Sequence, residues 1–339
     1  MNQSANSAQP VAGVGVAPDE VRQDRAALLV IAGLCIAITL AYLDFVALRY
    51  ADRRFEHHQL IVQGEALSPY RYRVLLPWLA HGIASAVSHW KILPYRTTVG
   101  GLYVAFTGIG LTVGFLVFYL YMRRWFPPQT ALLGTVYLCA LAPFTFLYIS
   151  FTPWAWWDLA VFTAGIWMAH EARRLSLLCL IIGGSFLRET TVFLAILYFL
   201  GRRGADPPRS LLLWTGLYGG SSAAVFLGLR FALGWAPHVG QAEYANPVFH
   251  RLVYNVTHVM PALTFVIFFG VLWILAVKEL HGKPQMLKNL LWFIPIFLVV
   301  HLFGAHMNES RYYYEIAPII MPLALMSLSP RRTAVRGAG

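Results

Sequence analysis

Long runs of apolar residues separated by short polar segments make up most of the chain. The first run, Ala26–Leu48, has the roughly 20 residues that an α-helix needs to cross the hydrocarbon core of a bilayer. Similar runs predict further crossings at Thr98–Met122, Gln129–Phe151, Trp157–Ala172, Leu211–Leu233, Val259–Val277, Asn289–Gly304 and Tyr313–Leu328. We therefore expect an all-α polytopic membrane protein with about eight full transmembrane helices.

Two other apolar segments are interrupted by polar residues, and we expect neither to cross. Arg73–Trp90 is short, and we predict a helix that lies in the membrane interface within a first outer loop, residues 49–97. Leu175–Leu200 carries Arg188 and Glu189 in its middle. We predict that it forms a re-entrant pair of half-helices that turns near this charged pair.

The distribution of Lys and Arg favours this arrangement, because loop Lys and Arg residues are retained on the cytoplasmic side. If neither interrupted segment crosses, both termini and all the compact basic clusters lie on that side. If both crossed, two arginine pairs would face outward. The clusters are Arg123/Arg124, Arg173/Arg174, Arg202/Arg203/Arg209, Lys278/Lys283/Lys288 and Arg331/Arg332/Arg336.

Composition supports a membrane protein and excludes a soluble one. Hydrophobic residues make up 58% of the chain and charged residues only 12%, about half the share of a soluble domain. The net charge of +11 follows from the clusters at the ends of apolar runs, so we expect no nucleic-acid partner. We predict disordered cytoplasmic tails at 1–25 and 330–339, and one transmembrane domain at 26–329. Neither a disulfide framework nor a zinc site is readable from Cys35, Cys139 and Cys179.

Basic residues that this orientation leaves on the outer side need an explanation other than topology. An anionic substrate is the simplest one, because guanidinium groups bind phosphate oxygens through two parallel hydrogen bonds. Contacts with ordinary phospholipid headgroups are the alternative, which we favour for Arg49, Arg53, Arg54, Lys91 and Arg96. The other outer cations are candidates for binding a lipid phosphate: Arg71, Arg73, Arg188, Arg230, Arg251 and Arg311.

Four segments, in order along the chain, resemble the GT-C superfamily of bacterial integral-membrane glycosyltransferases. An acidic residue after the first apolar run, then Gly64 and PYRYRVLLPWL at Pro69–Leu79, are similar to the first outer loop of these enzymes. The aromatic stretch Ala142–Phe162 resembles their second outer loop. Gly183–Phe193 looks like the short helix pair in which a basic residue caps the substrate cavity. His306–Pro322 is similar to the segment before the last spans of lipid-linked mannosyltransferases.

The resemblance implies an activity and a location. GT-C enzymes transfer a sugar from a polyprenyl-phosphate-linked donor, here to an envelope glycan, lipid or protein acceptor on the extracytoplasmic face of the bacterial cytoplasmic (inner) membrane. Membrane lipids are the other partners that it implies. The chain departs from the family because no DxD or DE pair follows the first apolar run, and because it is short for a GT-C enzyme. We therefore expect no cofactor and no metal, and an inverting transfer that depends on one carboxylate as general base.

Asp52 is our first choice for that base. It follows the first crossing by a few residues, where it would meet both water and a lipid headgroup, and a general base must lie within hydrogen-bonding reach of the acceptor hydroxyl. Asp44 is the second choice and Glu56 the third. A solvated loop carboxylate that balances a neighbouring arginine is the competing interpretation of Asp52.

Arg71 and Arg73, flanked by Tyr70 and Tyr72, are expected to hold the lipid phosphate while the rings pack against isoprenoid or sugar. An aromatic belt with interfacial arginines is the alternative.

Ionisable side chains inside apolar segments are costly there and usually face a cavity or each other. We expect Arg188 to contact the phosphate, with Glu189 orienting it; a structural ion pair is the alternative. Asp158 heads an apolar segment after three tryptophans, and either caps its helix or orients the acceptor.

His306, Glu309 and Arg311 are expected to close the site from the opposite side, with Arg311 on the phosphate and Glu309 orienting it. Ordinary loop solvation is the alternative. His57 and His58 are adjacent in sequence and would not face one metal, so we place them in a solvated loop.

Three other classes of function remain open. A lipid-linked glycan polymerase or ligase would share the outer arginines. A transporter or flippase would require repeats that the sequence does not display. A structural membrane protein would not explain so many outer charges. Convergence of Asp52, Arg71, Arg73, Arg188 and Arg311 on one outward-opening cavity would favour the glycosyltransferase, whereas scattered positions would favour a transporter or a structural protein.

Overall fold

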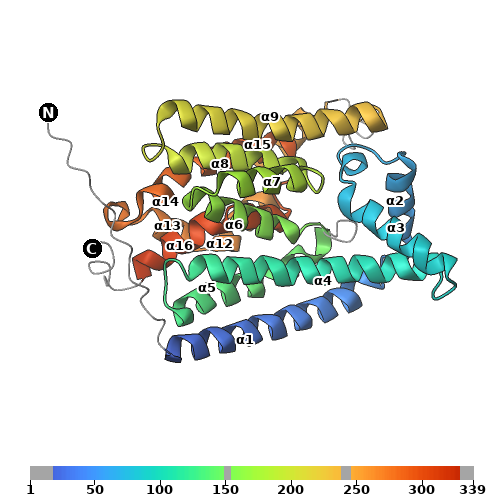
Figure 1. Ribbon diagram of the computed structural model, residues 1–339, viewed down its shortest axis with the longest axis horizontal. Helices are drawn as coiled ribbons and strands as arrows, with labels where there is room; N and C mark the ends of the chain where they lie inside the picture. Colours follow the sequence, from blue (N-terminus) through green and yellow to red (C-terminus); the bar gives the residue numbers. More distant parts are fainter. Residues whose placement is uncertain (1–17, 149–153, 238–245, 329–339) are drawn as a thin grey trace.

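A computed structural model describes residues 18–148, 154–237 and 246–328. All regular secondary structure in these ranges is helical, and most of the helices run along one common direction (Figure 1). The predicted tails at 1–25 and 330–339 lie mostly outside the described residues, but α1 begins at Pro18 and so includes the last part of the first one. The all-α prediction is confirmed.

Five helical segments are long and apolar enough to cross a membrane, or six if a pair bent by 68° counts as one span. The predicted number of eight is therefore not confirmed. The predicted segment Trp157–Ala172, for example, forms a helix of only 14 residues, α6 (Trp157–His170). The candidates are Asp19–Ala47, Tyr95–Met122, Pro128–Phe146, Pro208–Leu233 and Gln285–Gly304, with the bent pair Val248–Thr257 and Val259–Phe269.

The helices have the following bounds. The first half contains α1 (Pro18–Tyr42), a π-helical turn η1 (Leu43–Ala47), α2 (Ala51–Gln63), η2 (Tyr70–Tyr72), α3 (Leu75–His89), α4 (Tyr95–Met122), α5 (Pro128–Leu141), η3 (Ala142–Tyr148) and α6 (Trp157–His170). The second half contains α7 (Arg174–Ser185), η4 (Glu189–Val192), α8 (Phe193–Arg202), α9 (Pro208–Leu233), α11 (Pro247–Thr257), α12 (Val259–Phe269), α13 (Leu272–Val277), η5 (Leu280–Gly282), α14 (Gln285–Leu290), α15 (Phe293–Gly304), η6 (Ser310–Glu315) and α16 (Ala317–Leu328).

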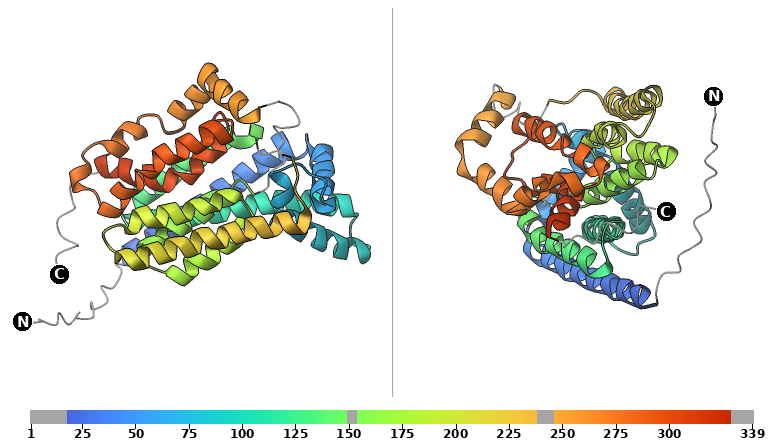
Figure 2. Two further views of the ribbon diagram at one scale, coloured as in Figure 1. Left: turned by 90° about the horizontal axis from the view of Figure 1, so that it is seen from above. Right: turned by 90° about the vertical axis from the view of Figure 1, so that its left-hand side faces the viewer.

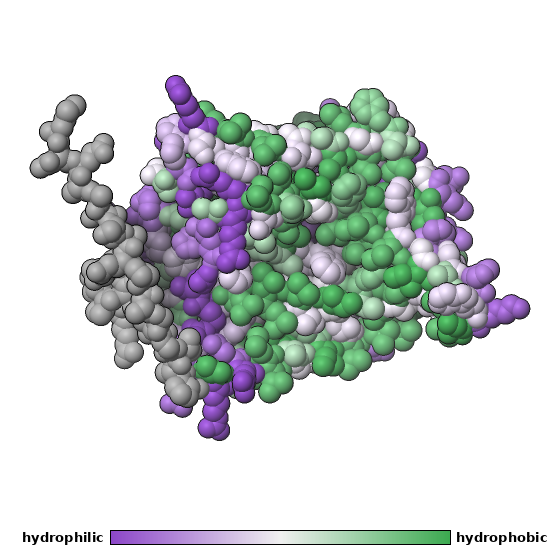
Figure 3. Space-filling view, viewed as in Figure 1, coloured by the Kyte–Doolittle hydropathy of each residue, from purple (hydrophilic) through white to green (hydrophobic). Residues whose placement is uncertain are grey.

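The surface has the polarity of a membrane protein. Hydrophobic side chains cover the middle of the face seen in Figure 3, and hydrophilic ones gather at its two ends. Seen nearly end-on, the helices surround α16 (Figure 2), whose residues from Ala317 to Leu325 are all buried. The interior is therefore filled by side chains, and the apolar outer surface fits contact with lipid.

One end of the bundle gathers the compact basic pairs with acidic partners. Arg123 binds Asp24 at 2.7 Å, and Glu171 pairs with both Arg124 and Arg173. These pairs join the start of α1, the end of α4 and the connection from α6 to α7. We refer to this end as the basic end.

The segment from α7 to α8 is a helical hairpin, as the sequence predicts. Asp206 forms an ion pair at 3.2 Å with Arg174, at the start of α7, and another at 2.5 Å with Arg202, at the end of α8. Both outer ends of the hairpin therefore lie at the basic end. With 12 and 10 residues, each helix is ~15–18 Å long, about half a hydrocarbon core. The turn, with Arg188 and η4, thus lies within the bundle.

Close packing of α4 on α6 places the start of α6 near the centre of the bundle. Gly110 and Gly114 lie one turn apart on α4. A Cβ on Gly110 would lie 2.6 Å from the Trp157 side chain, and a Cβ on Gly114 would lie 3.1 Å from the Trp156 carbonyl oxygen. Small residues at this spacing let two helices approach closely. The same contact directs Asp158 into the interior, where it is buried.

Residues 49–97 form a compact helical unit at the other end, which we call the outer end. The expected solvated loop around His57 and His58 is wrong, because both lie in α2. His58 is fully buried, and its ring nitrogens lie 3.0 Å from the Tyr103 hydroxyl and 2.9 Å from the Tyr95 hydroxyl. The helix was missed because its hydrophobic positions are few, and because its buried face is aromatic and hydrogen-bonded rather than aliphatic.

This histidine makes the outer end sensitive to acid. Burial lowers the pKa of His58 from 6.5 to about 4, so below pH 6.5 the unfolded chain binds a proton that the folded chain does not. The contribution of His58 to the free energy of unfolding is therefore fully present above pH 6.5. It is lost as the pH drops towards 4, by on the order of 3 kcal/mol. We expect the melting temperature in detergent to fall over this range.

His58→Gln is the matched variant, since glutamine can still donate and accept a hydrogen bond. His57 has a similarly lowered pKa, so the variant should lose only part of the pH-dependence while being less stable at pH 7.5. An unchanged pH-dependence in His58→Gln would show that His58 is not the responsible group.

Candidate functional site

The segment before α3 has two faces that make different contacts. Arg71 and Tyr72 point to the C-terminal end of α9: Arg71 donates to the Leu233 carbonyl, and the Tyr72 hydroxyl donates to the Gly234 carbonyl at 3.0 Å. Arg230 lies over the Tyr72 ring at 4.1 Å. These two residues therefore fasten the first outer unit to the end of α9.

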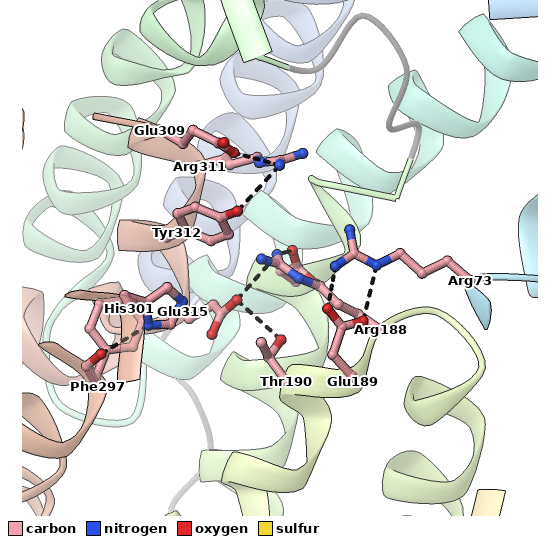
Figure 4. Close-up of polar contacts among 11 residues, drawn as sticks. Arg73, Arg188, Glu189, Thr190, Phe297, His301, Glu309, Arg311, Tyr312 and Glu315 are labelled. Carbon is pink, nitrogen blue, oxygen red and sulfur yellow. Dashed lines mark hydrogen bonds and ion pairs between the residues drawn. The ribbon is translucent and has the colours of Figure 1, made fainter. Parts of the chain in front are cut away.

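Tyr70 and Arg73 point the other way, into the bundle. Arg73 is buried and binds the Glu189 carboxylate through two nitrogens, with Nε donating to Oε2 at 3.0 Å (Figure 4). Its guanidinium also lies 5.6 Å from the Tyr70 ring and 5.8 Å from the Trp154 ring. A cation held between two aromatic rings and a carboxylate is the geometry of a built binding site rather than of a solvated loop.

Arg188 lies deeper and connects three elements. Its Nη1 donates to Asp158 of α6 and lies 3.2 Å from Glu315 of η6, and both carboxylates are buried with it (Figure 4). Thr190 donates to the same Glu315 oxygen at 3.2 Å. The Tyr312 ring covers the guanidinium at 4.9 Å.

Arg311 completes the cluster from the far side of Tyr312. It binds Glu309 at 2.5 Å and lies 5.2 Å from the Tyr312 ring. Tyr312 thus separates two guanidinium groups, one from η4 and one from η6. We call the set Arg73, Asp158, Arg188, Glu189, Glu309, Arg311 and Glu315 the charge cluster.

The cluster holds three guanidinium groups and four carboxyl groups, so full ionisation would leave one negative charge buried. Glu315, in η6 outside the candidate spans, relieves this excess. Burial raises its pKa, and the Asp158 charge on the same guanidinium raises it further, against the opposing effect of Arg188. A single proton on the carboxyl groups of the cluster would make it neutral.

A pocket of about 390 Å³ lies beside the cluster at the outer end. Its walls come from α2 and from the turn after it, with Tyr70 shared between the pocket and the Arg73 site. His57 packs edge-on against Tyr70, with ring centroids 4.8 Å apart. Burial, together with the nearby Arg73 charge, lowers the pKa of His57 to about 4, so this ring is neutral at pH 7.

The three carboxylates considered as base occupy different places. Asp52 is 78% exposed in the first turn of α2 and pairs with Arg96, outside the charge cluster. Asp44 is exposed in the π-helical turn η1, a type of turn that often occurs at functional sites. Glu56 is the one that lines the pocket.

The test was convergence of five residues on one outward-opening cavity. Arg73, Arg188 and Arg311 come together in the charge cluster, whereas Asp52 and Arg71 do not, and none of the five lines the pocket. The expected pairing of Arg188 with Glu189 is wrong: Arg188 binds Asp158, and Glu189 binds Arg73.

Asp158 does not cap its helix. The N-cap of α6 is Trp156, with no side-chain cap bond, and the Asp158 carboxylate is bound to Arg188 instead. His306 lies at the edge of the site, edge-on to the Tyr254 ring at 4.8 Å.

Sequence reasoning missed Glu315 and Tyr312. Glu315 directly precedes a run of apolar residues, and a carboxyl group at such a position is a signal that it is buried with a partner. Within the described residues, no group of three or more His, Cys, Asp or Glu side chains could hold a metal ion.

Comparisons with known proteins do not indicate a function, so the proposal below depends on the geometry of the site. No protein-family profile matches the chain, and no similar curated protein or solved structure was found.

Proposed function

We propose that this protein is a membrane glycosyltransferase that uses a polyprenyl-phosphate-linked sugar as donor. One observation carries the proposal: three buried guanidinium groups from three separate elements converge beside an open pocket, at the end of the bundle opposite the compact basic pairs. The fork of a guanidinium group matches the geometry of a phosphate bidentately.

In the proposed topology, the basic end and both termini face the cytoplasm of a bacterial cell, and the outer end faces the extracytoplasmic side of the inner membrane. The hairpin α7–η4–α8 is re-entrant, and α3 lies in the interface. Besides the five long apolar segments, the bent pair α11–α12 forms one crossing, and the short helices α6 and α16 form the other two.

The donor phosphate binds at Arg73. Glu189 keeps 35% of its side-chain surface accessible, whereas Arg73 keeps 6%, so Glu189 is the partner that can move aside. The phosphate then takes over the bidentate contact that Glu189 makes in its absence. Arg311 supports the phosphate from the opposite side, and Arg188 remains fixed by its two carboxyl partners.

Glu56 is the general base in this proposal, in place of the exposed Asp52. It removes the proton of the acceptor hydroxyl while the new bond forms between the acceptor oxygen and the anomeric carbon. The bond from that carbon to the phosphate oxygen breaks at the same time, and polyprenyl phosphate leaves with its charge held by the arginines.

The test is direct. Purified protein in lipid nanodiscs is incubated with a panel of polyprenyl-phosphate sugars, and released polyprenyl phosphate is measured by mass spectrometry. We expect the wild-type protein to consume one donor of the panel. Arg73→Met should consume the same donor at least 100-fold more slowly, because losing a group that stabilises transition-state charge typically costs about 10²–10³ in rate.

Lys278→Met, at an exposed position of the basic end, is the matched control and should retain the wild-type rate. Folded protein that consumes no donor in the panel would contradict the proposal.

A proton-coupled transporter is the second candidate. The observation that favours it is the hairpin interrupted at Arg188, combined with the buried carboxyl group of Glu315 beside it, because broken helices and buried acids line many transport pathways. Proteoliposomes with an internal pH-sensitive dye separate the two functions. Movement of protons with an added solute, without consumption of any lipid donor, would select the transporter.

A further inference from the structure

The pocket at the outer end has a lining that differs from that of the charge cluster. Tyr70 forms one wall, and Arg53, Glu56, His57 and Glu65 contribute polar groups around it. Its volume of about 390 Å³ lies at the lower end of the ~300–1,000 Å³ typical of small-molecule sites. This is enough room for one or two sugar rings, and too little for a long chain.

The charges of the lining exclude an anion as the preferred ligand. Two carboxylates face one guanidinium group, and His57 is neutral at pH 7 because burial lowers its pKa to about 4. The wall therefore carries more negative than positive charge and would repel a phosphate. It offers hydrogen-bond acceptors and a donor to a ligand that is polar and uncharged.

The turn after α2 holds these groups in place. Gly64 ends α2 in the left-handed conformation, with φ of +73°, and Glu65 N–H donates to the Leu60 carbonyl at 2.8 Å. This is the usual way for glycine to end a helix, and it reverses the chain so that Glu65 and Glu56 both line the pocket. Two carboxylates and one aromatic ring in the same lining suit the hydroxyl groups and the apolar face of a pyranose ring.

We propose that this pocket binds the terminal pyranose of a carbohydrate acceptor, stacked on Tyr70 and hydrogen-bonded by Glu65 and Arg53. The inference rests on the proposed function and adds to it the class of acceptor. It also places the acceptor hydroxyl beside Glu56, next to the phosphate site at Arg73, with which the pocket shares Tyr70.

Binding is tested without any transfer reaction. Full-length protein in detergent is mixed with methyl α-D-mannopyranoside, methyl β-D-glucopyranoside or inorganic phosphate, and saturation-transfer NMR reports the ligand protons that contact the protein. We expect a signal from the ring protons of at least one glycoside, and no competition by phosphate. The dissociation constant should rise about tenfold in Glu65→Gln.

Tyr70→Ala should abolish the signal, and Tyr70→Phe should retain it, because the ring and not the hydroxyl makes the contact. Glu279→Gln, an exposed carboxylate at the opposite end, is the control for a general charge effect. The melting temperature of each variant shows that it is folded.

Absence of a signal from both glycosides, or equal signals in wild type, Glu65→Gln and Tyr70→Ala, would overturn the inference. Donor consumption without glycoside binding would overturn the acceptor pocket but leave the proposed transfer standing. Glycoside binding without donor consumption would leave the pocket assigned and contradict the proposed transfer.

Discussion

Replacing Arg188 by methionine is expected to destabilise the protein more than any other single change in the charge cluster. Asp158 and Glu315 both depend on the one Nη1 atom of Arg188, and all three side chains are almost completely buried. Removing one partner of a buried ion pair leaves the other charge uncompensated, at a cost of about 3–5 kcal/mol. The measurement is the melting temperature of the purified protein in detergent, which should fall sharply.

The cause can be separated from a simple loss of packing. In the triple variant Arg188→Met, Asp158→Asn, Glu315→Gln, no buried charge remains in this part of the cluster, and most of the lost stability should return. Arg124→Met is the surface control: its guanidinium is 47% exposed, and its removal should cost ~1 kcal/mol or less. If the triple variant melts no higher than Arg188→Met, charge compensation is not what Arg188 provides.

The apolar periodicity of the sequence predicts the helical bundle because lipid-facing helices need long apolar runs, and α4 and α9 correspond closely to two of these runs. The hairpin at Arg188 was also predictable, since two charged residues in the middle of an apolar segment do not fit a simple crossing. The number of crossings was not predictable from the sequence. Short helices such as α6 and α16 are buried inside the bundle, where apolar composition no longer distinguishes a crossing from a core helix.

The arginines of the site were predictable, but their partners were not. Arg188 and Glu189 are adjacent, and the sequence suggests that they pair. The backbone at Arg188 is extended, with φ of −162° and ψ of 140°, and in extended chain successive side chains point to opposite sides. Glu189 therefore reaches Arg73, 116 positions away in sequence, while Arg188 turns towards Asp158 and Glu315.

A different local geometry divides the cluster of tyrosines and arginines before α3, because residues i and i+3 of a 3₁₀ turn lie on the same side. Sequence treats Tyr70, Arg71, Tyr72 and Arg73 as one binding unit, because nothing in their composition distinguishes them. Across the 3₁₀ turn η2 and its C-cap Arg73, the two middle residues, Arg71 and Tyr72, contact the end of α9, and the two outer ones, Tyr70 and Arg73, face the site. Which residue faces which side depends on where α9 ends, and that information comes from a distant part of the chain.

Glu56→Gln is expected to abolish sugar transfer, with a loss of about 10²–10⁴ in rate, while donor binding is unchanged. Glutamine has nearly the same shape as glutamate but cannot accept the proton of the acceptor hydroxyl. In the proposed function the donor phosphate binds at Arg73, which does not line the pocket, so the donor affinity should not respond. Turnover is measured as released polyprenyl phosphate, and affinity by equilibrium binding of the same donor.

Asp52→Asn is the matched comparison, because Asp52 lies one helical turn from Glu56 on α2 and was the first choice from sequence. Its carboxylate is 78% exposed and pairs with Arg96, which is itself 58% exposed, so removing its charge should change stability and turnover little. Loss of transfer in Asp52→Asn, with normal turnover in Glu56→Gln, would return the base to Asp52. Such a result would require the acceptor to approach along the Arg96 side of α2, and the pocket beside Tyr70 would then not contain the reacting hydroxyl.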